Sequence, residues 1–217
     1  MSGNIVIYAI RALVMLLAIP VHEASHALAS YLLGDSTAKD HGRLTLNPIA
    51  HFDLFGALCM VLTGFGWAKP VPIGANRFRQ PKLGMALSAL AGPVSNLLLG
   101  YFGYFGYKMI KYMLPIGRPR DILLLFFSVL VQMNVLLAVF NLIPVPPLDG
   151  SRILLIFLPQ RLYFAIMRYE TYIFLALFVV LMTGVLDAPL EFVQLFFHWL
   201  FDKGTLFVDM AFMSQAL

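Results

Sequence analysis

The chain has 217 residues, of which 60% are hydrophobic and 12% are charged, with a mean hydropathy of +0.84 and a formal net charge of +4. This composition is too apolar for a soluble domain of this length and indicates an integral protein of the lipid bilayer. The single cysteine, Cys59, excludes a disulfide framework and a cysteine-based metal site. The sequence has no basic run interleaved with aromatic residues, so we expect no nucleic-acid partner.

Four apolar segments approach or exceed the roughly 20 helical residues that cross a bilayer. They are residues 5–33, 83–107, 122–142 and 172–185, and we expect the third to continue, after a break, through residues 153–158. A shorter apolar stretch at 190–201 carries Glu191, Gln194 and His198, so it predicts an interfacial helix. Residues 52–67 are compatible with a re-entrant structure. We therefore predict an all-α polytopic membrane protein.

The first apolar segment contains His22-Glu23-Ala24-Ser25-His26, an HExxH motif. Ionisable side chains at membrane depth are costly unless they are paired, hydrated or bound to a metal. Because His22 and His26 are four residues apart, a helix points both imidazoles the same way, toward one Zn²⁺. Glu23 beside them suits a general base that deprotonates a zinc-activated water. The alternative interpretation is a buried histidine pair that is hydrogen-bonded to backbone or to each other.

A catalytic zinc site needs a third protein ligand and keeps its fourth position for water. The best candidate is Asp149, because three prolines interrupt the hydrophobic run that precedes it, at residues 141–150. Irregular backbone at membrane depth usually lines a cavity or a site. A turn in which Asp149 caps a helix is the alternative interpretation. Asp53, near the start of the predicted re-entrant segment, is a rival ligand.

The order of the spans brings the two parts of this site to similar depth. His26 lies seven residues before Leu33, and Asp149 lies ten residues before Pro159, about 10 and 15 Å along a helix. Both exits follow odd-numbered spans and therefore face the same side. That side carries nine of the fifteen Lys and Arg residues, which places it in the cytoplasm. We predict a multi-pass protein of the cell (inner) membrane with its active site nearer the cytoplasmic side.

Taken together, these motifs resemble the site-2 protease family (peptidase family M50) of intramembrane zinc metalloproteases, particularly its small prokaryotic members without a PDZ domain. Residues 141–150 match the family's Asn-Pro-Asp-Gly signature, and residues 42–48, 66–72 and 91–96 are similar to its intervening segments. The resemblance implies that His22, His26 and Asp149 hold zinc and that Glu23 activates water. It also implies that Asn141 helps to bind an extended substrate segment.

The resemblance further implies a three-helix catalytic core that hydrolyses peptide bonds in or near transmembrane segments of other membrane proteins. We expect this core at residues 1–158, with a re-entrant or loop region at about 42–76, and additional transmembrane and interfacial helices at 159–217. Pro70 and Pro72 alternate within residues 66–73, which fits a membrane-associated β element that receives substrate, or an ordinary proline-rich loop. A regulatory membrane partner and a homo-oligomer are both compatible with the sequence.

The second apolar segment contains Gly92, Pro93 and Asn96, which we interpret as helix-packing residues, with Asn96 able to hydrogen-bond across helices. Two functions of other classes remain as alternatives. A metal transporter would place more polar groups along a membrane path than the second and fourth segments contain. A catalytically silent chaperone or binding module would have lost Glu23 or a ligand, whereas all four residues are present.

Overall fold

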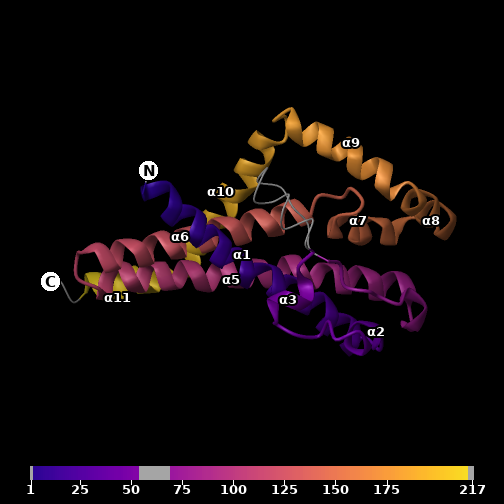
Figure 1. Cartoon of the computed structure of the whole chain (residues 1–217), viewed down its shortest axis with the longest axis horizontal. Coiled ribbons are helices and arrows are strands. Elements are labelled where there is room, and N and C mark those ends of the chain that lie inside the picture. The colour runs from indigo at the N-terminus through magenta and orange to yellow at the C-terminus, as the bar shows by residue number, and fades with distance from the viewer. Residues whose placement is uncertain (1, 54–68, 215–217) are drawn as a thin grey trace.

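Three long helices form the centre of the computed structural model, which describes residues 2–53 and 69–214. They are α1 (Ser2–Leu32), α5 (Pro81–Met113) and α6 (Arg118–Asn141) (Figure 1). Each is long and apolar enough to cross a bilayer, which confirms the first three predicted spans. The helix α5 packs along both of the others, and α1 also contacts α6.

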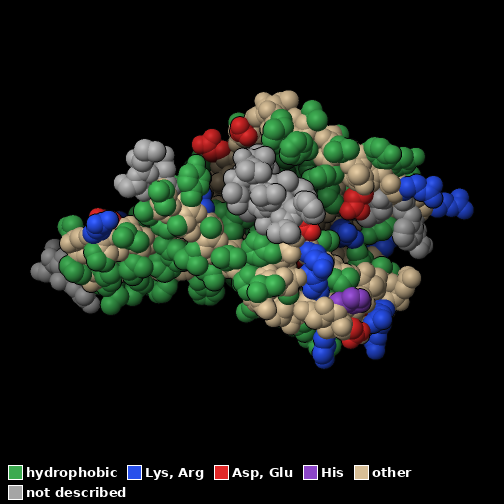
Figure 2. All heavy atoms as spheres, viewed as in Figure 1, with side chains coloured by type: hydrophobic (Ala, Val, Ile, Leu, Met, Phe, Trp, Pro, Cys, Tyr) green, Lys and Arg blue, Asp and Glu red, His purple; other side chains and the backbone are tan. Residues whose placement is uncertain are grey.

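Short connections and apolar packing explain this arrangement. Residues 114–117 join α5 to α6, and so short a connection makes the two helices antiparallel neighbours. Each of these helices has a proline in its first turn, where the missing N–H costs nothing. Buried side chains of α1 and α6 form one part of the core: Ile10, Val14, Val129 and Leu130. Many large apolar side chains remain on the outside, as expected for a lipid-facing surface, and Figure 2 shows them over much of the visible face.

The chain between α1 and α5 makes short elements at one end of the bundle. These are α2 (Thr37–Asp40), α3 (Pro48–His51) and the 3-10 turn η1 (Ala75–Arg77). The Lys69 N–H donates to the carbonyl of His51 at 2.8 Å, so the chain returns to the point where α3 ends. Residues 69–74 are not helical, as their prolines predict. The rest of the predicted β element and residues 54–67 of the predicted re-entrant stretch lie outside the described residues.

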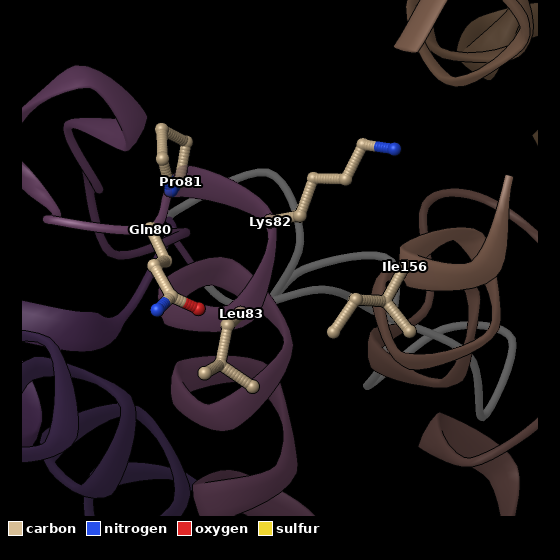
Figure 3. A pocket seen from close by; sticks show the side chains of 5 residues that line it. All are labelled: Gln80, Pro81, Lys82, Leu83 and Ile156. Atoms are coloured by element: carbon tan, nitrogen blue, oxygen red, sulfur yellow. The ribbon is translucent and has the colours of Figure 1, made fainter. Parts of the chain in front are cut away.

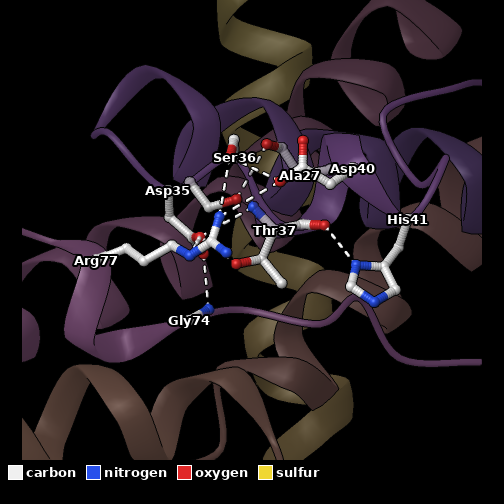
Figure 4. A network of polar contacts seen from close by, with 9 residues as sticks. Ala27, Asp35, Ser36, Thr37, Asp40, His41, Gly74 and Arg77 are labelled. Atoms are coloured by element: carbon white, nitrogen blue, oxygen red, sulfur yellow. Dashed lines mark hydrogen bonds and ion pairs between the residues drawn. The ribbon is translucent and has the colours of Figure 1, made fainter.

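A buried carboxylate fastens these elements to the end of α1. Asp35 is fully buried and accepts hydrogen bonds from the Thr37 N–H (3.0 Å), the Thr37 hydroxyl and the Gly74 N–H (2.7 Å). The guanidinium of Arg77 lies 3.9 Å from the same side chain (Figure 4). Burial alone would raise the pKa of Asp35, but these donors outweigh it and lower the pKa below its ordinary value.

After α6 the chain forms shorter helices. They are α7 (Asp149–Leu154), the 3-10 turn η2 (Leu155–Phe157), α8 (Gln160–Arg168), α9 (Glu170–Met182), α10 (Asp187–Gly204) and α11 (Leu206–Met213). Instead of resuming as one helix, residues 153–158 divide between α7 and η2. The fourth predicted span, residues 172–185, corresponds to α9, which ends just before Gly184, where the backbone adopts a left-handed φ of +71°. Helices α9 and α10 meet at 86° and qualify together as one broken span.

The helix α10 is longer than the interfacial helix predicted at 190–201, and it packs against α5 and α6 with Phe201 buried.

A buried lysine, Lys108, links α5 to the C-terminal helices through ion pairs. Lys108 of α5 lies 2.8 Å from the carboxylate of Asp202 in α10 and 2.5 Å from that of Asp209 in α11. Tyr104 and Tyr112 donate to the same two carboxylates. This network holds the C-terminal helices against the end of α5 that is remote from Pro81.

Candidate active site

The two histidines of the HExxH motif lie where α1 packs against α5. Both side chains are buried, with exposed fractions of 6%. Their rings meet edge to face, and the two Nε2 atoms are 3.0 Å apart. The four-residue spacing in α1 therefore directs both imidazoles to one point, as the sequence predicts.

Asp149, the first residue of α7, completes the cluster from a different part of the chain. Its Oδ2 atom lies 3.3 Å from Nε2 of His22 and 3.3 Å from Nε2 of His26. Within residues 2–53 and 69–214, these three residues are the one group of three or more His, Cys, Asp or Glu side chains placed to hold a metal ion. The rival ligand Asp53 is not part of it.

The dimensions of this triangle fit a zinc ion. Ligand atoms about 2.0–2.1 Å from a tetrahedral metal lie about 3.3–3.4 Å from each other. The three observed separations are 3.0, 3.3 and 3.3 Å. A histidine pair that only hydrogen-bonds within itself would not require a carboxylate oxygen equidistant from both rings. The donor set of two imidazoles and one carboxylate is also one that catalytic zinc sites use.

Backbone from α5 supports one of the two rings. Nδ1 of His26 lies 2.7 Å from the carbonyl oxygen of Ser88, to which it can donate. This bond leaves the Nε2 lone pair of His26 directed at His22 and Asp149. Metal-binding histidines are commonly oriented in this way, through a hydrogen bond from their other nitrogen.

Two glycines allow the parts of the cluster to approach. A Cβ atom on Gly92 would lie 2.4 Å from Nε2 of His26 and 2.7 Å from Cε1 of His22, so only glycine leaves room for the rings beside α5. A Cβ atom on Gly150 would lie 2.1 Å from the carbonyl oxygen of Leu142, where α7 begins against the end of α6. The packing role predicted for Gly92 is therefore packing against the histidines themselves.

The structure places the other two predicted site residues nearby in the chain without joining them to the triangle. Glu23 is half-buried on α1, and no hydrogen bond or ion pair links its carboxylate to another described residue. Asn141 is the last residue of α6, and its Nδ2 donates to the carbonyl of Leu137 at 2.9 Å. Glu23 is thus free to accept a proton, and the Oδ1 atom of Asn141 makes no hydrogen bond to another described residue.

A cavity of about 400 Å³ lies at the start of α5, facing η2 (Figure 3). It is lined by Gln80, Pro81, Lys82, Leu83 and Ile156. Lys82 also donates to the carbonyl of Leu158, which links the start of α5 to the chain after η2. Because the lining residues 80–83 precede Ser88 by five to eight residues, the cavity lies about 8–12 Å along the chain from the Ser88 end of the histidine cluster.

The chain is similar to a known protein family and to a named relative. The model of "Peptidase family M50" matches residues 119–184, which include Asn141 and Asp149. A protein of Bacillus subtilis (strain 168) named "Putative zinc metalloprotease YwhC" is 40% identical over 176 residues, which cover 76% of this chain and 78% of that relative. The chain belongs to peptidase family M50. No solved structure gives a significant match to this M50 protein.

Membership in family M50 identifies the protein as a metalloprotease of the site-2 protease family. Its apolar helices identify it as a membrane protein. The sequence interpretation missed the contact between Ser88 and His26. A signal for it was present, because Ser88, Gly92 and Asn96 recur at four-residue intervals and so share one face of an otherwise apolar helix.

Proposed function

We propose that this M50 metalloprotease is an intramembrane zinc endopeptidase that hydrolyses peptide bonds in or near transmembrane segments of other membrane proteins. The observation that carries the proposal is the buried triangle of His22, His26 and Asp149 inside a bundle of membrane-spanning helices. A zinc protease of aqueous substrates has no need to bury its ligands among such helices. The name of the Bacillus subtilis relative, "Putative zinc metalloprotease YwhC", supports the choice of metal.

Each residue has a distinct task in this proposal. His22, His26 and Asp149 hold the Zn²⁺, which supplies the Lewis acidity that makes a water nucleophilic at neutral pH. Glu23 accepts the proton of the attacking water and later delivers it to the leaving amine. Its half-buried position, with no fixed partner among the described residues, suits a group that must take up and release a proton.

The substrate segment must lose helical structure before its carbonyl can be attacked, because an α-helix engages its own carbonyls in i→i+4 hydrogen bonds. Asn141 offers both a donor and an acceptor to an unwound backbone. It stands at the end of α6, immediately before the irregular residues that lead to Asp149. We therefore assign Asn141 to substrate binding.

The active site lies nearer one end of the helix bundle than the other. The triangle lies toward the end of the bundle where α1 ends, where α5 begins and where α7 packs against α5. Basic side chains gather over this end, which carries α2, α3 and α8 in Figure 2. By the positive-inside rule we assign this end to the cytoplasmic side of a multi-pass inner-membrane protein.

Proteolysis of a mixed population of membrane proteins tests the proposal. The wild type and Glu23→Gln are purified in detergent, loaded with zinc, and reconstituted with solubilised bacterial membrane proteins, whose new N-termini are identified by mass spectrometry. Glu191→Gln, on α10, is a matched carboxylate control. We expect new termini within transmembrane segments or a few residues from them, in the wild type and the control only. Equal cleavage by Glu23→Gln, or cleavage confined to soluble domains, would refute the proposal.

A further inference from the structure

The helices α1 and α5 pair in a regular antiparallel register at the histidine cluster. His26 contacts Ser88 through its Nδ1 atom, and Gly92, one turn later in α5, faces both rings, with an added Cβ 2.4 Å from Nε2 of His26 and 2.7 Å from Cε1 of His22. Continuing this register by one more turn in α5 leads to Asn96. The three α5 residues therefore form one stripe that faces the histidines.

Two buried polar side chains at this level have unmatched hydrogen-bonding groups. Nδ1 of His22 is buried and has no hydrogen-bond partner among the described residues. Asn96 is fully buried, and neither its Oδ1 nor its Nδ2 has a partner in the described part of the chain. Buried polar groups without a partner are uncommon and costly. Nδ1 of His22 can donate a hydrogen bond, and Oδ1 of Asn96 can accept one.

Helix geometry directs the amide of Asn96 toward His22. Side chains of an α-helix tilt toward its N-terminus, so a residue covers the turn that precedes its own Cα. For Asn96 this preceding turn is that of Gly92, which has no side chain to fill the space. A Cβ on Gly92 would lie 2.7 Å from Cε1 of His22, the ring atom between Nδ1 and Nε2. We therefore expect the Asn96 amide to face the turn of Gly92, beside the His22 ring.

We propose that Asn96 is a positioning residue whose Oδ1 accepts the Nδ1–H of His22 through one ordered water, since the two atoms make no direct hydrogen bond in the structure. This bond would do for His22 what the Ser88 carbonyl does for His26. It fixes the tautomer in which Nε2 carries the lone pair and faces Asp149. The inference rests on the metal site of the proposed function and assigns Asn96 a role in metal affinity, in addition to helix packing.

Zinc affinity, measured without any substrate, tests this role. The wild type, Asn96→Leu and Asn96→Asp are purified in detergent, and zinc dissociation constants are measured by competition with a chromophoric chelator. Leucine keeps the approximate volume and removes the acceptor, whereas aspartate keeps an acceptor. Loss of a group that supports a metal ligand typically costs about 10–100-fold in affinity. We expect such a loss for Asn96→Leu and affinity close to wild type for Asn96→Asp.

Asn134→Leu is the matched control. Asn134 is also fully buried, but it lies on α6 and its Nδ2 donates to the carbonyl of Leu130. Its neighbour Val135 packs at the level of Gly100, about 12 Å along α5 from Gly92. The control should bind zinc like the wild type. If Asn96→Leu does not give a monodisperse protein, Asn96→Ala is measured in the same way.

Both outcomes are decisive. A loss of about tenfold or more in the variant without an acceptor, restored by aspartate, supports the proposal. A smaller loss, or one that aspartate does not restore, overturns it and leaves Asn96 as a packing residue. A wild type that binds zinc but cleaves no membrane protein would refute the endopeptidase proposal while leaving the role of Asn96 standing.

Discussion

Substituting alanine for Gly92 should damage the metal site selectively. The added Cβ would lie 2.4 Å from both Nε2 and Cε1 of His26, whereas ordinary van der Waals contact begins at about 3.4 Å. The ring or the α5 backbone must therefore move by about 1 Å, since 3.4 minus 2.4 is 1.0. Metal sites tolerate deviations of about 0.2 Å in ligand distances. We expect the zinc affinity to fall at least about tenfold, which is the lower end of the effect of disturbing groups that support ligands.

The assay compares zinc dissociation constants and the thermal unfolding of the zinc-free proteins. Gly103→Ala is the control, because its Cβ would meet only the Leu130 and Val131 side chains, at 3.1 and 3.3 Å. Both substitutions gain about 1 kcal/mol of helix propensity, so this gain cancels in the comparison. Wild-type zinc affinity in Gly92→Ala, with the fold intact, would refute the placement of the histidine rings against α5.

Three further perturbations address other parts of the molecule. Asp149→Ala should weaken zinc binding and His22→Ala/His26→Ala should abolish it, as measured by metal content; full zinc in the double variant would place the metal elsewhere. Lys108→Met should lower the free energy of unfolding by about 1–3 kcal/mol. This is less than the cost of breaking a fully buried pair, because the Asp202 side chain is 45% exposed. Lys108→Arg should retain most of the stability, and thermal unfolding in detergent compares the two variants with the wild type. Because its folded-state pKa is lowered, Asp35 stabilises the fold fully above its unfolded pKa of about 3.9, and this contribution falls below that pH and is lost as the pH passes through the lower folded-state pKa. The melting temperature of Asp35→Asn should therefore depend less on pH between about 5 and 3 than that of the wild type, and parallel curves would contradict this account.

The sequence predicted the parts of the fold that depend on local apolarity. The spans at 5–33, 83–107 and 122–142 correspond to α1, α5 and α6, because twenty or more apolar residues have few alternatives to a helix across the bilayer. Its prediction for the C-terminal region was less accurate. Composition alone did not reveal that Gly184 would end α9, or that Lys108 would hold α10 and α11 against α5.

For the candidate site, the sequence predicted residue types better than their arrangement. A spacing of four residues places His22 and His26 together on any α-helix, so their convergence needed no tertiary information. Asp149 required an argument from membrane topology, and the structure places its carboxylate at the two imidazoles. The distance from Asp149 to the membrane exit was estimated for one continuous helix, but the chain there divides into α7 and η2. The roles of Glu23 and Asn141 remain predictions.

The residues that support the ligands could not be assigned because their importance depends on the register between α1 and α5. A glycine in a membrane-spanning helix usually allows two helices to approach, and this is how the sequence interpretation understood Gly92. In the structure, the group admitted by Gly92 is the imidazole pair, and the group admitted by Gly150 is the backbone that positions Asp149. Substitutions at either glycine would therefore disturb metal binding first and helix packing second. Zinc affinity and unfolding temperature must be measured on the same variants, since a loss of proteolysis alone would not distinguish these two effects.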